Sequence, residues 1–136
     1  MVDTHTINHK FSILVTWSLF LQNLHGYDFR HNMTVSWDEI GTYATDLFTL
    51  EAEKIISNHD TEQPLFLYLS HLAVHSGNCV QPLQAPQEAI DKHSYIQEQN
   101  RRNFSGMVTK LDESVGKVCN IFAAFKQTFS LYLILR

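Results

Sequence analysis

The sequence predicts an α/β protein in which helices flank a mainly parallel sheet. One observation is a segment of helical periodicity that leads directly into a near-continuous apolar run of strand length, the repeating unit of such sheets. A second is a long amphipathic segment in the C-terminal third. The length of 136 residues permits one domain. Apolar residues make up 44% and charged residues 18%, which excludes a disordered chain.

The N-terminal region is open to three interpretations. Residues 11–21 (FSILVTWSLFL) form an apolar run that is too short for a membrane span, which takes about 20 residues. The run can be the apolar core of a signal peptide, since Lys10 precedes it, although no small-residue cleavage site follows. It can equally be a buried strand, or Met1 to Leu24 can be non-native coding sequence. After Gly26 we expect a short extended stretch and loops.

A helix is expected over residues 45–58. Thr45 or Asp46 can cap it by accepting hydrogen bonds from free backbone N–H groups. Its buried stripe is predicted from residues at helical spacing, namely Leu47, Phe48, Ala52, Ile55 and Ile56.

The next element is a predicted strand that Pro64 opens. The run Leu65 to Ser70 is apolar enough for a strand covered on both faces. We expect it to end near Ala73 or Val74, and a polar loop containing His75 then follows. Ligands gather at this edge of parallel sheets, so His75 is a candidate site residue.

The remaining chain is predicted to be mostly helical. Pro82 and Pro86 bracket a rigid loop, and a short helix follows over 87–92. A long helix begins at about Tyr95. Its buried stripe is predicted from Phe104, Val108, Leu111, Val115, Val118 and Phe122. On the same helix, Asp112 and Glu113 are read as a solvated face. The apolar tail over 129–136 is a candidate strand.

Charge and cysteine usage exclude several functions. A net charge of -4 and a pI near 6.0 argue against nucleic-acid binding, for which Lys and Arg would cluster. Cys79 and Cys119 form neither a CxxC pair nor a zinc ligand set, and they can be bridged or free. The eight histidines are mostly read as scattered surface and turn residues, and His71 on the predicted strand is given no role.

An ordered series of motifs resembles the sulfatase family, and within it the arylsulfatase B-like branch. The series spans Gly26 to about Val118. Its members are GYDFR (26–30), YATDLFT (43–49), PLFLYL (64–69), AVHSGN (73–78), PLQAP (82–86), NRR (100–102), GMV (106–108) and LDESVG (111–116). Each motif is weak alone, and the order makes the series specific.

The resemblance implies an alkaline-phosphatase-like α/β fold and hydrolysis of sulfate esters, on sugars or aryl groups. Full-length members use a formylglycine made from cysteine as nucleophile, and calcium to polarise the sulfate. His75 matches the family histidine that contacts the substrate sulfate. The family implies a lysosomal or secreted protein, and no membrane span is expected. Two sequons, at Asn32 and Asn103, are glycosylation candidates.

The chain departs from the family pattern in its catalytic parts. Neither Cys79 nor Cys119 lies in a Cys-x-Pro-x-Arg motif, and the calcium ligands have no counterpart. We therefore divide the chain into an unassigned 1–25, a partial catalytic domain over 26–118, and a helix end with apolar tail over 119–136. The fragment alone is expected to be inactive. The alternative is a short non-catalytic binding protein that retains part of the fold.

Overall fold

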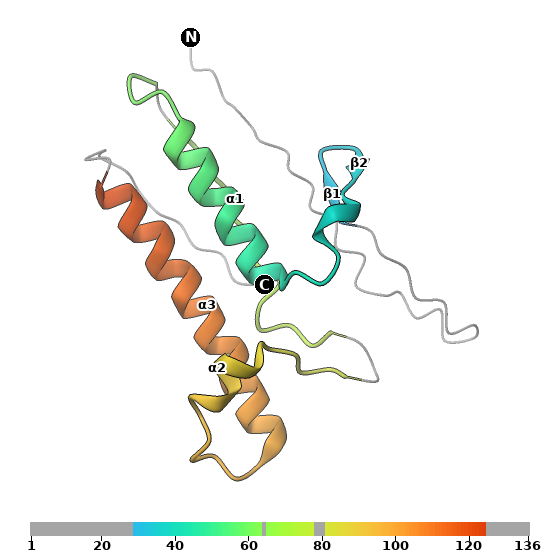
Figure 1. Ribbon diagram of the computed structural model, residues 1–136. Coiled ribbons are helices and arrows are strands. Elements are labelled where there is room, and N and C mark those ends of the chain that lie inside the picture. Colours follow the sequence, from blue (N-terminus) through green and yellow to red (C-terminus); the bar gives the residue numbers. More distant parts are fainter. Residues whose placement is uncertain (1–28, 64, 78–80, 125–136) are drawn as a thin grey trace.

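Two long helices lie side by side and form the frame of the molecule. The computed structural model describes residues 29–63, 65–77 and 81–124. Helix α1 spans Ala44–Asn58, and helix α3 spans Gln99–Ala124. The short helix α2, Gln87–Asp91, packs against the N-terminal half of α3 (Figure 1). All three predicted helices are confirmed, with ends that differ by a few residues.

Helix α1 begins one residue earlier than expected, and this changes the role of its first polar residues. The residue before its first turn is Tyr43, which makes no capping hydrogen bond with its side chain. Thr45 is already helical and buried, and Asp46 forms an ion pair with Lys110. The predicted capping role of Thr45 or Asp46 is therefore wrong, because both residues lie inside the first turn and the Asp46 carboxylate pairs with Lys110 of α3.

Helix α3 begins where the Glu98 carboxylate accepts hydrogen bonds from the backbone N–H groups of Asn100 and Arg101. Such bonds satisfy donors that have no partner inside the helix. Its buried residues are Gly106, Met107, Lys110, Leu111, Ser114, Val118 and Phe122. The predicted stripe is correct at its C-terminal end but wrong for Phe104 and Val108, which are exposed. The buried stripe is rotated because α1 and α2 pack on the side that carries Gly106, Lys110 and Ser114.

The core lies where α1 and α3 meet the segment after α1. Ala52 and Ile56 pack with Val118 and Phe122, and Leu65, Leu67 and Leu69 pack against this cluster. Residues 65–77, which are described continuously, are called the extended segment below. Its burial alternates residue by residue from 65 to 70, as expected for an extended chain with one face inward.

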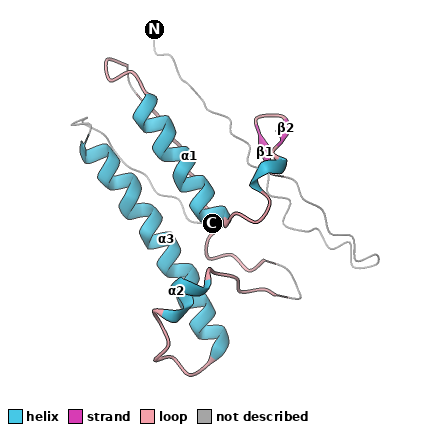
Figure 2. Ribbon diagram, viewed as in Figure 1, coloured by secondary structure: helices cyan, strands magenta, loops and turns pink. Residues whose placement is uncertain are grey.

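The predicted parallel sheet is not confirmed. The sheet in the described residues is an antiparallel pair, β1 (Arg30–His31) and β2 (Thr34–Val35), followed by the 3-10 turn Trp37–Glu39. Figure 2 shows the extended segment drawn as loop rather than strand. It has no ladder partner among the described residues, so it meets no hydrogen-bond criterion for a strand.

The prediction that this run is covered on both faces is wrong for the described part of the chain. Phe66 is 68% exposed and Tyr68 is 55% exposed, while Leu65, Leu67 and Leu69 face the helices. The expectations for residues 1–28 and for the tail over 129–136 lie outside the described residues. Within the part that is described, no helix combines the length and the apolar character needed to cross a membrane.

The exposed aromatic face gives a solubility prediction. Replacing Phe66 and Tyr68 with threonine should raise the soluble yield several-fold, because an exposed apolar face on an extended segment promotes association between chains. Stability should change little, since both side chains are largely in solvent. Yield after centrifugation and thermal melting measure the two effects.

The matched control is Leu67→Thr, one residue away on the inward face. It should lower the free energy of unfolding by about 1–2 kcal/mol, because it removes apolar burial and inserts a hydroxyl. Equal effects of the two substitutions on stability would contradict the alternation of faces.

Candidate functional site

His75 lies where the extended segment ends, on an exposed turn. Its backbone N–H donates to the carbonyl of Leu72 at 2.9 Å, and its ring Nδ1 lies 2.7 Å from the carbonyl of Ser76. A carbonyl can only accept, so Nδ1 carries the hydrogen of the neutral ring. The other nitrogen, Nε2, then keeps the lone pair that can take up a proton and donate it to an anion.

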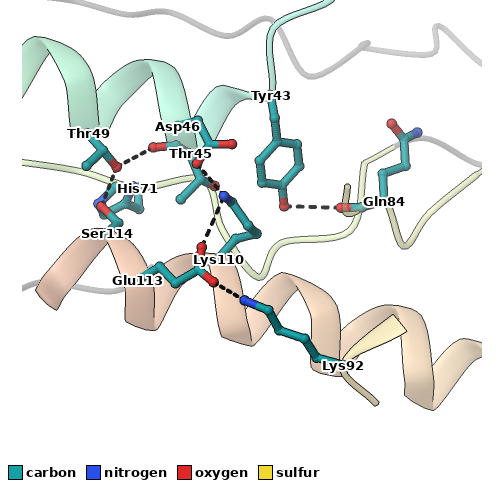
Figure 3. A network of polar contacts seen from close by, with 10 residues as sticks. All are labelled: Tyr43, Thr45, Asp46, Thr49, His71, Gln84, Lys92, Lys110, Glu113 and Ser114. Carbon is teal, nitrogen blue, oxygen red and sulfur yellow. Dashed lines mark hydrogen bonds and ion pairs between the residues drawn. The ribbon is translucent and has the colours of Figure 1, made fainter. Parts of the chain in front are cut away.

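The loop that carries His75 is held at two points. The Gly77 N–H donates to the carbonyl of Pro82 at 2.7 Å, which closes the loop on itself. The Tyr43 hydroxyl donates to the carbonyl of Gln84 at 3.1 Å, which ties the loop to the start of α1 (Figure 3). Burial raises the pKa of Tyr43, so it stays a neutral donor. These contacts position His75 without burying it.

The two sequon asparagines occupy different environments. Asn32 sits in the exposed turn between β1 and β2, with a φ of 57°. Asparagine tolerates this left-handed conformation well. Asn103 lies in the second turn of α3 and is half-buried. Its side-chain Oδ1 accepts a hydrogen bond from Gln99 Nε2 at 2.7 Å. The structure places Asn32, Asn103 and His75 on three different elements.

The described residues do not fit the cofactors of a sulfatase. In residues 29–63, 65–77 and 81–124, no three His, Cys, Asp or Glu side chains converge as metal ligands. Cys119 is a half-buried free thiol on α3. Cys79 lies outside the described residues.

An ion-pair chain joins α1, α3 and the residue that directly follows α2. Lys110 is only 6% exposed, and its Nζ lies 2.7 Å from Asp46 Oδ1 and 3.2 Å from Glu113 Oε2. Glu113 Oε1 in turn lies 2.6 Å from Nζ of Lys92 (Figure 3). Glu113 is thus a pairing residue rather than part of a purely solvated face, while Asp112 is exposed as predicted.

The pairing outweighs the cost of burying the charges. Desolvation lowers the pKa of Lys110, but the hydrogen bonds that its ammonium donates to Asp46 and Glu113 raise the pKa by more, so the net pKa lies above the usual value. The hydrogen bond from Lys92, with Lys110 adding to it, holds the pKa of Glu113 below its usual range. Both groups therefore stay charged across the neutral range, and Lys110 is a fixed cation within the fold.

A second polar cluster joins the extended segment to both long helices. His71 is 2% exposed, and its Nε2 lies 3.0 Å from Ser114 Oγ. Ser114 Oγ lies 2.6 Å from Thr49 Oγ1, which is also 2.6 Å from the carbonyl of Thr45 (Figure 3). Burial lowers the pKa of His71, so its imidazole is neutral near pH 7.

The Ser114–His71 pair resembles a nucleophile beside its base, but its environment excludes that role. Ser114 is 2% exposed, and no substrate can reach its hydroxyl. In addition, the hydroxyl already contacts Thr49. The pair is thus a structural hydrogen bond, and His75 is the accessible histidine of the segment.

Sequence reasoning missed the residues of both polar clusters. The signal was present: Lys110 and Ser114 stand four residues apart inside the helical periodicity of α3, on the side where Met107 and Val118 are buried. A polar stripe interleaved with buried positions indicates partners on a facing helix. It does not say which partners, and Asp46, Thr49 and His71 come from distant parts of the sequence.

Comparison with known proteins identifies the family. The chain matches the family model Sulfatase over residues 3–133. The chain belongs to the sulfatase family, as the ordered motif series indicated. It is similar to arylsulfatase J of Mus musculus, with 38% identity over 94 residues. The match covers 68% of this chain and 15% of that relative, so the chain spans a small part of the relative's length.

Proposed function

We propose that this chain is part of the catalytic domain of an arylsulfatase-type sulfuric ester hydrolase. The observation that carries the proposal is the position of His75, exposed at the end of a segment that the helix pair holds in place. Family membership supplies the reaction class, and the motif series favours the arylsulfatase B-like branch. The substrate class is then a sulfated carbohydrate or an aryl sulfate ester.

The proposed role of His75 is to contact the sulfate group. Its Nδ1 is engaged by the Ser76 carbonyl, so the proton that the ring gains or loses resides on Nε2. A protonated Nε2 donates a charge-assisted hydrogen bond to a sulfate oxygen, which stabilises negative charge as the ester bond breaks. An exposed loop is the right place for such a group, because the ester must reach it from solvent.

The 136-residue chain alone is proposed to be inactive. Covalent sulfatase chemistry needs a nucleophile, and neither Cys79 nor Cys119 lies in the required sequence motif. The calcium and formylglycine of the family are therefore properties of the full-length enzymes. We further propose a lysosomal or secreted location, with Asn32 the better placed glycosylation acceptor because its turn is open to solvent.

A chimaera tests the role of His75. The matched 94-residue span of mouse arylsulfatase J is replaced with that of this chain, and turnover of an aryl sulfate is measured after coexpression with a formylglycine-generating enzyme. We expect turnover, and a loss of about 100-fold or more in kcat/KM on His75→Ala, the size typical of a lost transition-state donor. Ser76→Ala, at the neighbouring exposed position, should retain activity because only its carbonyl is used.

Two results would count against the proposal. One is a folded, active chimaera whose turnover is unchanged by His75→Ala. The other concerns the isolated chain, for which we expect no turnover above that of its own His75→Ala variant. Turnover by the isolated chain would show that the nucleophile lies within these 136 residues.

A further inference from the structure

We propose that His71 is an acid-sensitive latch: its buried neutral imidazole holds the extended segment against α1 and α3, and its protonation releases the segment together with His75. The latch concerns the docking of residues 65–77 and is independent of whether His75 contacts sulfate.

His71 is buried between the two long helices, with a ring contact to α1 and a polar contact to α3. Its ring packs against Phe48 of α1 with the ring centroids 6.3 Å apart. Its Nε2 contacts Ser114 of α3, and Ser114 contacts Thr49 of α1. The rest of the docking is apolar packing by Leu65, Leu67 and Leu69, which does not respond to pH. A change of charge at His71 therefore acts directly on the contact between segment and helices.

Counting protons gives the direction of these hydrogen bonds. Each hydroxyl has one hydrogen to donate. If Thr49 donates to the carbonyl of Thr45, Ser114 donates to Thr49, and the Nε2–H of His71 then donates to Ser114. Every hydrogen in this arrangement has an acceptor. The group left over is the lone pair on Nδ1 of His71, which is buried without a partner among the described residues.

Protonation breaks this arrangement. The added proton goes to Nδ1, which has no hydrogen-bond acceptor in the described part of the chain. It also places a positive charge in a site that is 2% exposed, where an uncompensated charge is strongly unfavourable. In the reverse arrangement Ser114 donates to Nε2 of His71, and the ring hydrogen is then on Nδ1. This N–H is buried without an acceptor among the described residues even when the ring is neutral.

The charged groups on the facing elements do not offset this cost. On α1 the group is Asp46, and on α3 the groups are Lys110 and Glu113. They pair with one another, and Lys92 completes the neutralisation of Glu113. On the segment itself the other titratable groups are the exposed Tyr68 and His75. Burial, rather than any of these charges, is what lowers the pKa of His71.

The pH window follows from that direction. When the segment is released, His71 is in solvent and titrates near the usual value of 6.5; when docked, it titrates lower. At a pH between these two pKa values, His71 is protonated in the released state but not in the docked state. Docking is therefore intact above pH 6.5 and weakens as the pH falls below 6.5. The docking constant should fall about tenfold per pH unit in this window. Glu113, held below its usual 4.5 by Lys92, titrates outside it.

The experiment uses the full 136-residue chain with labelled imidazole and methyl groups. Histidine titrations by NMR between pH 8 and pH 5 give the pKa of His71. Nuclear Overhauser contacts between the methyls of Leu67 and those of the α1–α3 cluster that it packs against report docking. We expect His71 to titrate below 6.5 and the methyl contacts to weaken over the same range. His71→Gln can still donate to Ser114 but does not titrate, so its contacts should persist. The control His75→Gln should behave like the native chain.

Three outcomes would overturn the latch: a His71 pKa at or above 6.5, methyl contacts that persist after His71 is protonated, or a His71→Gln variant with the native pH dependence. If His71→Gln fails to fold, the titration of the native chain still decides, because it needs no substitution. Loss of activity in the chimaera with His75→Ala leaves these readouts unchanged, so the latch and the proposed function fail separately.

Discussion

The Asp46→Ala variant is expected to lose about 2–3 kcal/mol of unfolding free energy. Lys110 is 6% exposed, and Asp46 is its nearer carboxylate, at 2.7 Å against 3.2 Å for Glu113. Removing one partner of a fully buried pair costs about 3–5 kcal/mol, because the other charge stays behind. The Asp46 side chain is 33% exposed, so a smaller loss is expected here. Glu113 remains to compensate in part, and this lowers the expected loss. Urea denaturation followed by circular dichroism measures it.

A double substitution shows whether the loss of stability in Asp46→Ala comes from the Lys110 charge that remains buried without this partner. Lys110→Met keeps an apolar chain of similar length in the same space, so it should cost less than about 1 kcal/mol. In the Lys110→Met background, Asp46→Ala should then be nearly neutral, because no buried cation remains to be stranded. If Asp46→Ala costs the same in both backgrounds, the helix pair does not depend on this ion pair.

The pH dependence of this pair has a defined sign. The pKa of Lys110 is raised in the folded state, so its contribution to stability is fully present below 10.5 and is lost as pH rises through the folded value. Glu113 affects the stability at acidic pH. Its folded pKa is depressed, so its contribution is present above 4.5 and is lost as pH falls through the lower value. The network is therefore most stabilising between these limits.

The helices could be predicted from sequence because their signals are local. In α1, Leu47, Phe48, Ala52 and Ile56 recur at helical spacing and are all buried. The end of α3 behaves in the same way at Val118 and Phe122. The error at Phe104 and Val108 has a physical cause. Apolar spacing identifies a face, but which of two overlapping faces is buried depends on where α1 and α2 pack.

The sheet could not be predicted because a strand is defined by its neighbours. The run from Leu65 to Ser70 has the composition of a strand covered on both faces, and the described residues cover one. The inward leucines are satisfied by the helix pair, while Phe66 and Tyr68 face solvent. The apolar pattern therefore predicts neighbours on both faces of the run, and the described residues provide neighbours on one face.

Of the candidate site, the sequence singled out His75, which lies within a family motif. His75 was singled out by its place after an apolar run and by the family pattern, and the structure puts it on an exposed, tethered turn. His71, four residues earlier, is the buried histidine. Its partner Ser114 lies 43 residues away in sequence, and Ser114 in turn contacts Thr49, 65 residues away. No local pattern links such positions, because the hydrogen bonds arise only when α1 and α3 pack.

A comparison of two glycines in α3 tests how closely α2 packs on it. A Cβ added at Gly106 would lie 3.0 Å from Cγ1 and 3.1 Å from the backbone N of Ile90, and 3.2 Å from Cβ of Ala85. The backbone contact cannot be relieved by a rotamer change, so α2 must move. Gly116, in the same helix, has open space at the same position.

Gly106→Ala should therefore lower the free energy of unfolding by about 1–2 kcal/mol, the cost of overpacking minus the gain in helix propensity. Gly116→Ala should raise it by about 0.5–1 kcal/mol, because only the propensity gain applies there. Both substitutions add the same methyl group to the same helix, so their difference isolates the contact with α2. Chemical denaturation of the two variants side by side measures that difference. If both variants are stabilised, α2 does not lie against α3 at Gly106.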